Sequence, residues 1–251
     1  MKTTISIFRK EDSIALFLKF FRYFKKRFSG FFFCLTSPYY WLKIKTSNFK
    51  NIDELVDLTF NGFGKLIKPN QIPEEICQLL KILEKKKPRI ILEIGTEKGG
   101  TLFLFSNITP KNAVIVSIDL PQGKFGGGYP KWKIPLYKSF VKENRRIFLI
   151  RVDSHERKSL EKVKEILNNQ KIDFLFIDGD HTYEGVKKDW EIYKPLVKKG
   201  GLIAFHDIVV HPSKTGCEVN KFWEEIKERY DYVEIVKDLN QSWAGIGVIY
   251  I

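Results

Sequence analysis

Residues 172–181 read Ile-Asp-Phe-Leu-Phe-Ile-Asp-Gly-Asp-His and combine an apolar run with carboxylates and an imidazole. The apolar run predicts a buried strand, so Asp178, Asp180 and His181 are expected at the point where the chain leaves the core. Burying these charges is costly unless a metal, a partner or a ligand compensates them. An imidazole can also accept a proton near neutral pH. The segment is therefore the leading candidate for an active site.

A glycine-containing motif lies upstream, where Glu93-Ile94-Gly95-Thr96-Glu97-Lys98-Gly99-Gly100-Thr101 follows another apolar run. Glycines at such a place allow a tight strand-to-helix turn and let a ligand approach backbone N–H groups. The spacing differs from the G-x-G-x-x-G motif of dinucleotide-binding proteins, and the Gly-Lys-Ser/Thr of a P-loop is absent. Taken alone, the motif is equally consistent with a purely structural turn.

Polar side chains also follow two other apolar runs, as Asp119 and as Asp153-Ser154. An acid at such a strand end suits ribose hydroxyls, and the polar pair suits the edge of an adenine. For any one of these residues, and most of all for Asp180 and Ser154, a helix N-cap is the structural alternative. Their joint occurrence at four strand ends favours a ligand site, because ligands bind at the carboxyl ends of parallel strands.

The elements that must position these residues follow from the alternation of patterns along the chain. Strands are expected at 90–94, 113–118, 147–152, 172–177, 202–206, 232–236 and 245–250. Helices are expected at 73–87, 98–107, 131–144, 156–168, 183–195 and 219–230. This order is typical of a doubly wound α/β domain with a mostly parallel, seven-stranded, Rossmann-like sheet. We expect this domain to span residues 73–251.

Residues 1–72 are expected to form a basic, aromatic, helical appendage with a linker. The net charge is +13, and residues 1–50 alone carry eleven Lys/Arg against Glu11 and Asp12. Residues 14–28 have the apolar spacing of an amphipathic helix, and two interpretations stay open for this stretch. It packs on the main domain or on a second copy in a homo-oligomer, or residues 14–41 contact an anionic membrane surface.

The location of the protein is also predicted from composition. Cys34, Cys77 and Cys217 are few and widely spaced, so we interpret them as reduced thiols and not as a disulfide frame or zinc site. No uninterrupted apolar stretch reaches the length of about 18 residues that a membrane span needs. We therefore expect a cytoplasmic protein, peripheral at the membrane if the second interpretation of the appendage holds.

The ordered set of motifs resembles the class I S-adenosylmethionine-dependent methyltransferases. Within that class it is similar to the metal-assisted O-methyltransferases, including the macrolide-sugar and rhamnosyl enzymes and, more distantly, catechol O-methyltransferase. The resemblance rests on Glu93-x-Gly95-x-x-x-Gly99, Asp119, Asp153-Ser154, Asp178-Gly179-Asp180-His181 and Gly200-Gly201-x-x-x-x-His206-Asp207. It covers residues 73–251 and excludes residues 1–72.

The resemblance implies a role for each of these positions. The cofactor S-adenosylmethionine would be held by Glu93, Gly95, Thr96 and Gly99 near its methionine portion, by Asp119 at its ribose, and by Asp153 and Ser154 near its adenine. A divalent metal would be bound by Asp178, His206 and Asp207, and His181 would act as general base beside Asp178. The family often has two oxygen donors where this chain has His206-Asp207. Magnesium prefers oxygen ligands, so three options stay open: His206 beside the metal without binding it, manganese as the metal, or no metal.

The implied function is O-methylation of a hydroxyl on a sugar, a glycan or another small molecule. A nucleic-acid methyltransferase is an alternative that the net charge suggests. However, Asp-Gly-Asp-His stands where such enzymes usually carry Asn/Asp-Pro-Pro-aromatic, so no specific nucleic-acid partner is expected. A non-catalytic cofactor-binding or membrane-surface module is a third possibility.

The loop 121–130 is interpreted as an active-site lid, and Tyr129, Lys131 and Trp132 as sugar contacts. Trp243 is equally compatible with the core and with the site. His155 and His211 are expected in loops or at the surface.

Overall fold

The computed structural model describes residues 39, 41–63 and 66–251. The chain separates into two units, Met1–Ile44 and Lys45–Ile251. The second unit carries the whole sheet and begins at Lys45, ahead of the predicted domain start at Pro73. The helix expected over residues 14–28 lies outside the described residues.

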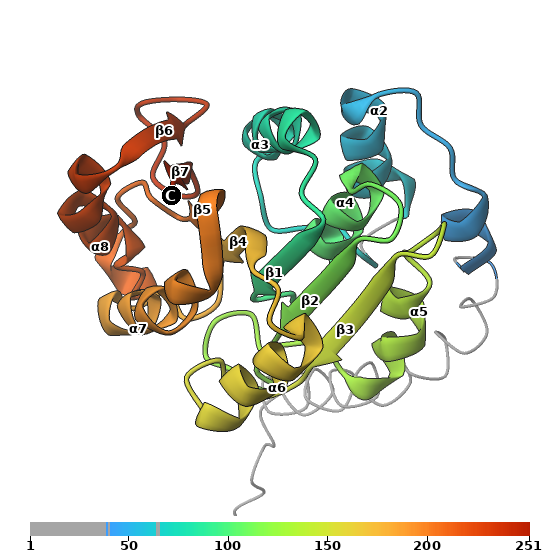
Figure 1. Ribbon diagram of the computed structural model, residues 1–251. Helices are drawn as coiled ribbons and strands as arrows, with labels where there is room; N and C mark the ends of the chain where they lie inside the picture. The colour runs from blue at the N-terminus through green and yellow to red at the C-terminus, as the bar shows by residue number, and fades with distance from the viewer. Residues whose placement is uncertain (1–38, 40, 64–65) are drawn as a thin grey trace, which may run out of the picture. The chain divides into compact units, whose positions relative to one another are not determined.

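Seven strands form one sheet in the order β3-β2-β1-β4-β5-β7-β6 (Figure 1). The strands are β1 (Ile90–Ile94), β2 (Val114–Ile118), β3 (Arg146–Ile150), β4 (Ile172–Ile177), β5 (Val197–His206), β6 (Asp231–Ile235) and β7 (Ile246–Tyr250). The first five are parallel, whereas β7 runs antiparallel between β5 and β6. The predicted doubly wound, mostly parallel sheet is therefore confirmed. The central strands β1 and β2 are buried at every position, which explains why they read as continuous apolar runs.

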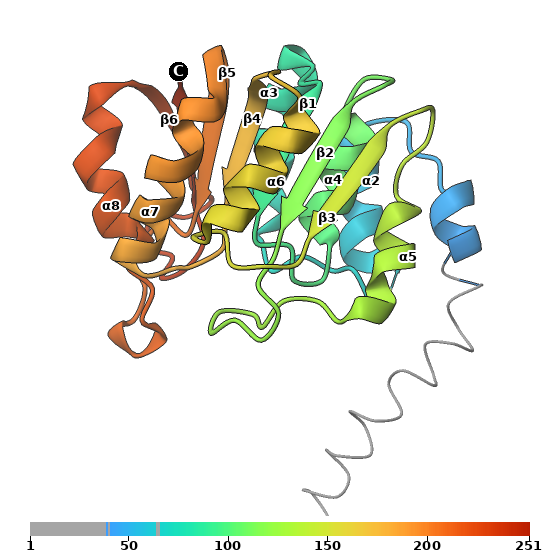
Figure 2. The same ribbon diagram turned by 60° about the horizontal axis from the view of Figure 1, so that its bottom comes forward.

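Helices cover both faces of the sheet (Figure 2). One face carries α3 (Pro73–Lys86) and α4 (Gly100–Ile108), and α2 (Ile52–Asp57) packs on both of these helices. The other face carries α6 (Arg157–Leu167), α7 (Tyr183–Tyr193) and α8 (Val219–Ile226). On the first face Phe105 packs edge-on against Phe174 and Phe176 of β4, and on the second Trp190 packs against Phe205 of β5. These aromatic contacts anchor the two helical layers to the strands that carry the candidate site.

The helix expected over residues 131–144 is much shorter than predicted. A single 3-10 turn, Lys131–Lys133, leads into α5 (Ile134–Lys138), and the helix ends there. Farther on, Glu143 and Asn144 have left-handed backbone, with φ of 56° and 61°. A helical path cannot continue through such residues, although the apolar spacing of this segment suits a helix. The remaining short segments are η1 (Leu58–Gly62), η3 (Lys194–Leu196), η4 (Ser213–Thr215) and η5 (Lys227–Arg229).

The carboxyl ends of β1 to β5 meet at one edge of the sheet, as parallel pairing requires. The polar groups that follow these strands in the sequence are therefore brought together in space. Within the described part of the chain, none of the helices has the length and apolar character that crossing a membrane requires.

Candidate active site

A cavity of about 530 Å³ opens at this edge of the sheet. Its wall combines the loop after β1, the ends of β2 to β5, part of the loop 121–130 and the segment before α8. Most of the predicted site residues line it: Gly95, Thr96, Asp119, Asp153, Ser154, Asp178, His181, His206 and Asp207. The tertiary structure thus gathers into one cavity residues that the sequence spreads over more than a hundred positions.

Gly95 shapes the turn between β1 and α4. Its backbone has a φ of +89°, and a Cβ atom there would lie 1.9 Å from the carbonyl oxygen of Asp178. The end of β4 is in turn held to β1, because the Asp178 N–H donates to the carbonyl of Ile94 at 2.8 Å. Only glycine satisfies both the left-handed backbone and this close approach.

Glu93 supports the same turn from behind. It is fully buried, and it accepts hydrogen bonds from the hydroxyls of Thr101 at 2.6 Å and Thr96 at 2.9 Å. Burial raises the pKa of its carboxyl to about 8, against the effect of the two hydroxyl donors. Neither Glu93 nor Gly99 contributes to the cavity wall. The structure therefore places both residues behind the loop and does not place them at its ligand-facing surface.

Asp119 lies at the end of β2 and faces the cavity. Its carboxylate accepts backbone N–H groups from Tyr129 at 3.0 Å and from Thr96 at 3.4 Å. Burial raises its pKa to about 6, while these backbone donors act in the opposite direction. The residue thus ties the glycine loop to the loop 121–130.

Asp153 and Ser154 follow β3 and line another part of the cavity. The Asp153 carboxylate accepts the backbone N–H of His155 at 2.8 Å, and the carbonyl of Ser154 accepts the hydroxyl of Tyr193 at 2.7 Å. Helix α6 begins later, with Glu156 at its N-cap position. Ser154 therefore does not cap this helix, and its side chain contacts the buried carboxylate of Asp189.

The remaining predicted residues form a compact polar cluster. His181 Nδ1 lies 2.7 Å from Asp207 Oδ2, and His181 Nε2 lies 3.5 Å from Asp178 Oδ1. His206 Nδ1 lies 3.1 Å from Asp178 Oδ1 and 3.2 Å from Asp207 Oδ1. Burial by itself would lower the pKa values of both imidazoles. The neighbouring carboxylates outweigh burial and raise the pKa to about 11 for His181 and about 10 for His206.

Asp180 stands apart from this cluster. Its carboxylate accepts the backbone N–H of Thr182 at 3.0 Å and the Thr182 hydroxyl at 2.8 Å. Thr182 itself caps α7 by accepting the N–H of Gly185. Asp180 therefore orders the turn that leads into α7.

The cluster fits a divalent cation. Asp178, His206 and Asp207 each offer one ligand atom, and these atoms lie within 4.8 Å of one another. The two carboxylates converge on one imidazole nitrogen, an arrangement that requires a positive charge between them. The other ring nitrogen of His206, Nε2, is buried and has no hydrogen-bond partner among the described residues. A metal-ligating histidine usually donates this second N–H, so the carboxylates suit a cation better than His206 does.

Four side chains that the sequence did not single out belong to this site. Gln71 Nε2 donates to Asp178 Oδ2 at 2.9 Å, and the Phe125 ring stacks on His181 with centroids 4.9 Å apart. His211 Nε2 lies 3.1 Å from Asp207 Oδ1, and Cys217 contacts both His181 and His211.

Comparison with known proteins finds similarity to methyltransferases. Residues 92–208 match the family described as "Methyltransferase domain". This segment holds β2 to β5 and most of the residues that line the cavity.

Individual relatives agree with this match. The tapetum-specific methyltransferase 1 of Arabidopsis thaliana is 29% identical over 159 residues, which cover 61% of this chain and 61% of that protein. The O-methyltransferase TomG from Streptomyces achromogenes has the same fold, with a TM-score of 0.52 at 15% identity over 82% of this chain and 92% of that one. CalS11, a TDP-rhamnose 3′-O-methyltransferase, gives a TM-score of 0.52 at 19% identity over 82% and 90%. The chain spans 15% to 65% of the length of the curated relatives that it matches.

Three residues predicted to contact a sugar lie outside the wall of the cavity. Tyr129, Lys131 and Trp132 do not line the cavity, and Tyr129 is 2% exposed and packs edge-on against Tyr137. Tyr129 is buried by apolar packing, although its position in the loop suggested a ligand contact. Trp243, for which core and site were both open, is half-exposed and lines the cavity.

The two histidines expected at the surface or in loops do lie in loops, and each of them pairs with a buried aspartate. His155 Nε2 lies 3.2 Å from the fully buried Asp189, and His211 joins the polar cluster through Asp207. The only sequence signal for His211 was its position four residues after Asp207. Gln71 gave no signal at all, because it lies 107 positions from Asp178 in the sequence.

Proposed function

We propose that this protein is an S-adenosylmethionine-dependent O-methyltransferase for a hydroxyl of a sugar, a glycan or another small molecule. We further propose that a divalent metal assists the reaction and that His181 is the base. The convergence of Asp178, His181 and Asp207 in the same cavity as the Gly95 loop and Asp119 carries this proposal.

The first task of the chain is to hold the cofactor, which supplies an electrophilic methyl group on a sulfonium. Gly95, which has no Cβ atom, lets a ligand approach the backbone of the β1–α4 turn, and Asp119 can accept hydrogen bonds from ribose hydroxyls. Asp153 and Ser154 provide polar groups at the position proposed for the adenine. Transfer of a methyl group is an in-line displacement, so catalysis depends mainly on the alignment of donor and acceptor.

The second task is to remove the proton of the acceptor hydroxyl. Asp207 accepts the Nδ1–H of His181 at 2.7 Å, which fixes the ring and leaves Nε2 as the atom that would take the proton. The carboxylates alone hold the ring protonated, so a cation held between Asp178 and Asp207 would have to lower the pKa of His181 before Nε2 could act as the base. The Phe125 ring stacks on the His181 imidazole and holds the plane of that imidazole. Asp178 and Asp207, with His206 beside them, would hold the metal, which lowers the pKa of a bound hydroxyl when present.

The choice of a hydroxyl acceptor is supported by the activities of similar proteins. TomG is an O-methyltransferase, and CalS11 methylates a TDP-rhamnose. A relative from Dictyostelium discoideum, 24% identical over 64% of this chain, is a probable caffeoyl-CoA O-methyltransferase. Methyl transfer to an oxygen atom is what these proteins have in common, and it is the reaction proposed here.

Calorimetry with S-adenosylmethionine and S-adenosylhomocysteine tests the cofactor part on the full chain. We expect saturable binding that Asp119→Asn weakens by about tenfold or more, because a hydrogen bond to a charged group is lost. Asp231→Asn, an exposed change on β6, is the matched control and should bind as the wild type does. Failure of the wild type to bind either ligand would overturn the proposal.

The metal and base parts are tested by methyl transfer to a panel of nucleotide sugars and catechol-type hydroxyls. A chelator and His181→Gln should each reduce turnover strongly while cofactor affinity changes little. Turnover that withstands the chelator would remove the metal from the proposal, and full activity of His181→Gln would remove the base.

A further inference from the structure

We infer that His181, Asp207 and Cys217 form a binding site for a thiophilic divalent cation such as Zn²⁺, with His211 as a fourth donor. This site differs in its donors from the Asp178–His206–Asp207 group, with which it shares only Asp207. The inference is argued from the donors themselves and does not depend on the proposed methyl transfer.

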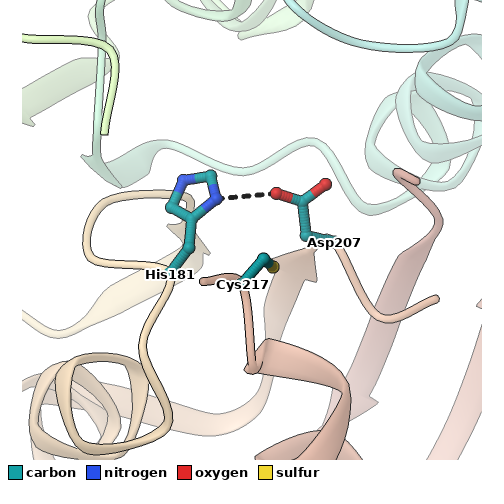
Figure 3. Close-up of side chains that lie close together, drawn as sticks. All are labelled: His181, Asp207 and Cys217. Carbon is teal, nitrogen blue, oxygen red and sulfur yellow. Dashed lines mark ion pairs between the residues drawn. The ribbon is translucent and has the colours of Figure 1, made fainter. Parts of the chain in front are cut away.

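The three ligands come from separate segments that the fold brings together. His181 precedes α7, Asp207 follows β5, and Cys217 precedes α8. One ligand atom from each lies within 4.8 Å of the other two. Figure 3 shows the three side chains converging, with Cys217 beside the ion pair that joins His181 to Asp207.

The backbone holds Cys217 in this place. The N–H of Glu218 donates to the carbonyl of His181 at 2.7 Å, which ties the segment before α8 to the segment before α7. The N–H of Cys217 itself donates to the hydroxyl of Thr215 at 3.2 Å. These two hydrogen bonds, one between backbone groups and one to a side-chain hydroxyl, hold the backbone of Cys217 close to His181.

The surroundings of Cys217 provide further metal-binding groups. Its thiol contacts His181 and His211, and the Asp207 carboxylate also faces it. The thiolate is the form of cysteine that binds metals.

His211 has the contacts expected of a metal-ligating imidazole. Its Nδ1 atom lies 2.8 Å from the carbonyl of Val209, which fixes Nδ1 as the protonated nitrogen. The other nitrogen, Nε2, lies 3.1 Å from Asp207 Oδ1 and 3.3 Å from the N–H of Ala244. Nε2 and the Asp207 oxygen therefore face each other, so one cation could contact both atoms.

The combination of donors selects the class of cation. Thiolate and imidazole ligands suit zinc and other soft transition metals, whereas magnesium and calcium prefer oxygen. Zinc sites in proteins are usually tetrahedral and are built from cysteine, histidine and carboxylate side chains. Two imidazoles, one thiolate and one carboxylate supply such a set.

Titration of the full-length protein with Co²⁺, a coloured substitute for zinc, tests the inference by absorption spectroscopy. We expect a thiolate-to-cobalt charge-transfer band that Zn²⁺ abolishes by displacement. Cys217→Ser and Cys217→Ala should both lose this band and bind Zn²⁺ at least about tenfold more weakly. Cys77→Ser is the matched control, because the Cys77 thiol is hydrogen-bonded to Asp53 and both residues are distant in the sequence from the proposed ligands. This variant should keep the band.

Asp178→Asn separates this inference from the proposed function. This variant removes a ligand of the Asp178–His206–Asp207 group and none of the proposed zinc ligands. The thiolate band should therefore persist even though methyl transfer is lost. Absence of a thiolate band in the wild type, or a band that both Cys217 variants retain while their circular dichroism is native, would overturn the inference. Loss of cofactor binding with an intact band would instead count against the proposed function alone.

Discussion

The ionisation of Asp119 gives the cofactor site a predictable dependence on pH. Burial raises the pKa of this carboxyl from 3.8 to about 6, and ribose hydroxyls are best accepted by the ionised form. Affinity for S-adenosylhomocysteine should therefore be constant at high pH and fall by roughly tenfold between pH 7.5 and pH 5, where the carboxyl is mostly protonated. Calorimetry at the two pH values measures this change.

The Asp119→Asn variant is the control for that measurement. Its affinity should be lower at pH 7.5 and nearly independent of pH, because the titrating group is gone. Equal pH dependence in the variant and the wild type would assign the effect to another group.

The buried carboxyl of Glu93 makes the stability of the fold depend on pH. Its pKa is about 8 in the folded protein against 4.5 for an ordinary glutamate, and the main cause is burial. The folded state thus binds more protons than the unfolded state between these pH values. The free energy of unfolding must therefore fall as pH rises from about 4.5 to 8, by an amount on the order of a few kcal/mol.

Glu93→Gln keeps the shape of the protonated side chain and cannot ionise. Urea denaturation should show the variant gaining stability relative to the wild type as pH rises from 5 to 8.5. Glu84→Gln, an exposed change on α3, should follow the wild type at both pH values. Parallel curves for Glu93→Gln and the wild type would show that Glu93 is ionised in the fold.

At the scale of elements, the contact between the β1–α4 turn and the end of β4 positions the site. Gly95→Ala would place a Cβ atom 1.9 Å from the Asp178 carbonyl oxygen, on a backbone with φ of +89°. We expect a loss of about 3 kcal/mol or more in the free energy of unfolding, because the two strands must separate to make room. Chemical denaturation and cofactor calorimetry should both register the change.

Gly200 provides the matched control for the effect of backbone strain. It also has positive φ, at +78°, but a Cβ atom there would meet nothing within 4 Å. Gly200→Ala should therefore cost only about 1–2 kcal/mol. Similar losses in the two variants would mean that backbone strain, and not the approach of β4, is what requires Gly95.

At the scale of the whole molecule, the basic N-terminal region is the part that the proposed reaction does not use. We propose that residues 14–41 bring the protein to an anionic membrane surface, because most of the positive charge lies in residues 1–50. Co-sedimentation of the full chain with phosphatidylserine-containing vesicles should exceed that of residues 45–251 and should decrease with salt. Equal sedimentation of the two would remove the membrane, and sedimentation velocity would then test assembly into a homo-oligomer.

The sequence alone predicted the succession of strands along the chain, the edge of the sheet where the candidate site lies, and most of the polar residues at this edge. These features depend on local patterns: apolar runs mark buried strands, and the residue after each run must lie at a carboxyl end. The sequence did not predict the early end of α5, where the N–H groups of Ser139 and Phe140 donate to carbonyls three residues back in tighter turns.

Only the tertiary structure decided what each of these polar residues does. Glu93 supports the turn from behind because Thr96 and Thr101 surround its carboxyl, and Asp180 orders the start of α7 because Thr182 lies against it. Gln71 and Cys217 join the site through contacts between segments distant in the chain, and no local pattern encodes such contacts. The sequence therefore names the donors and acceptors, whereas their protonation, pairing and choice of cation follow from packing, because burial and neighbouring charges set these properties.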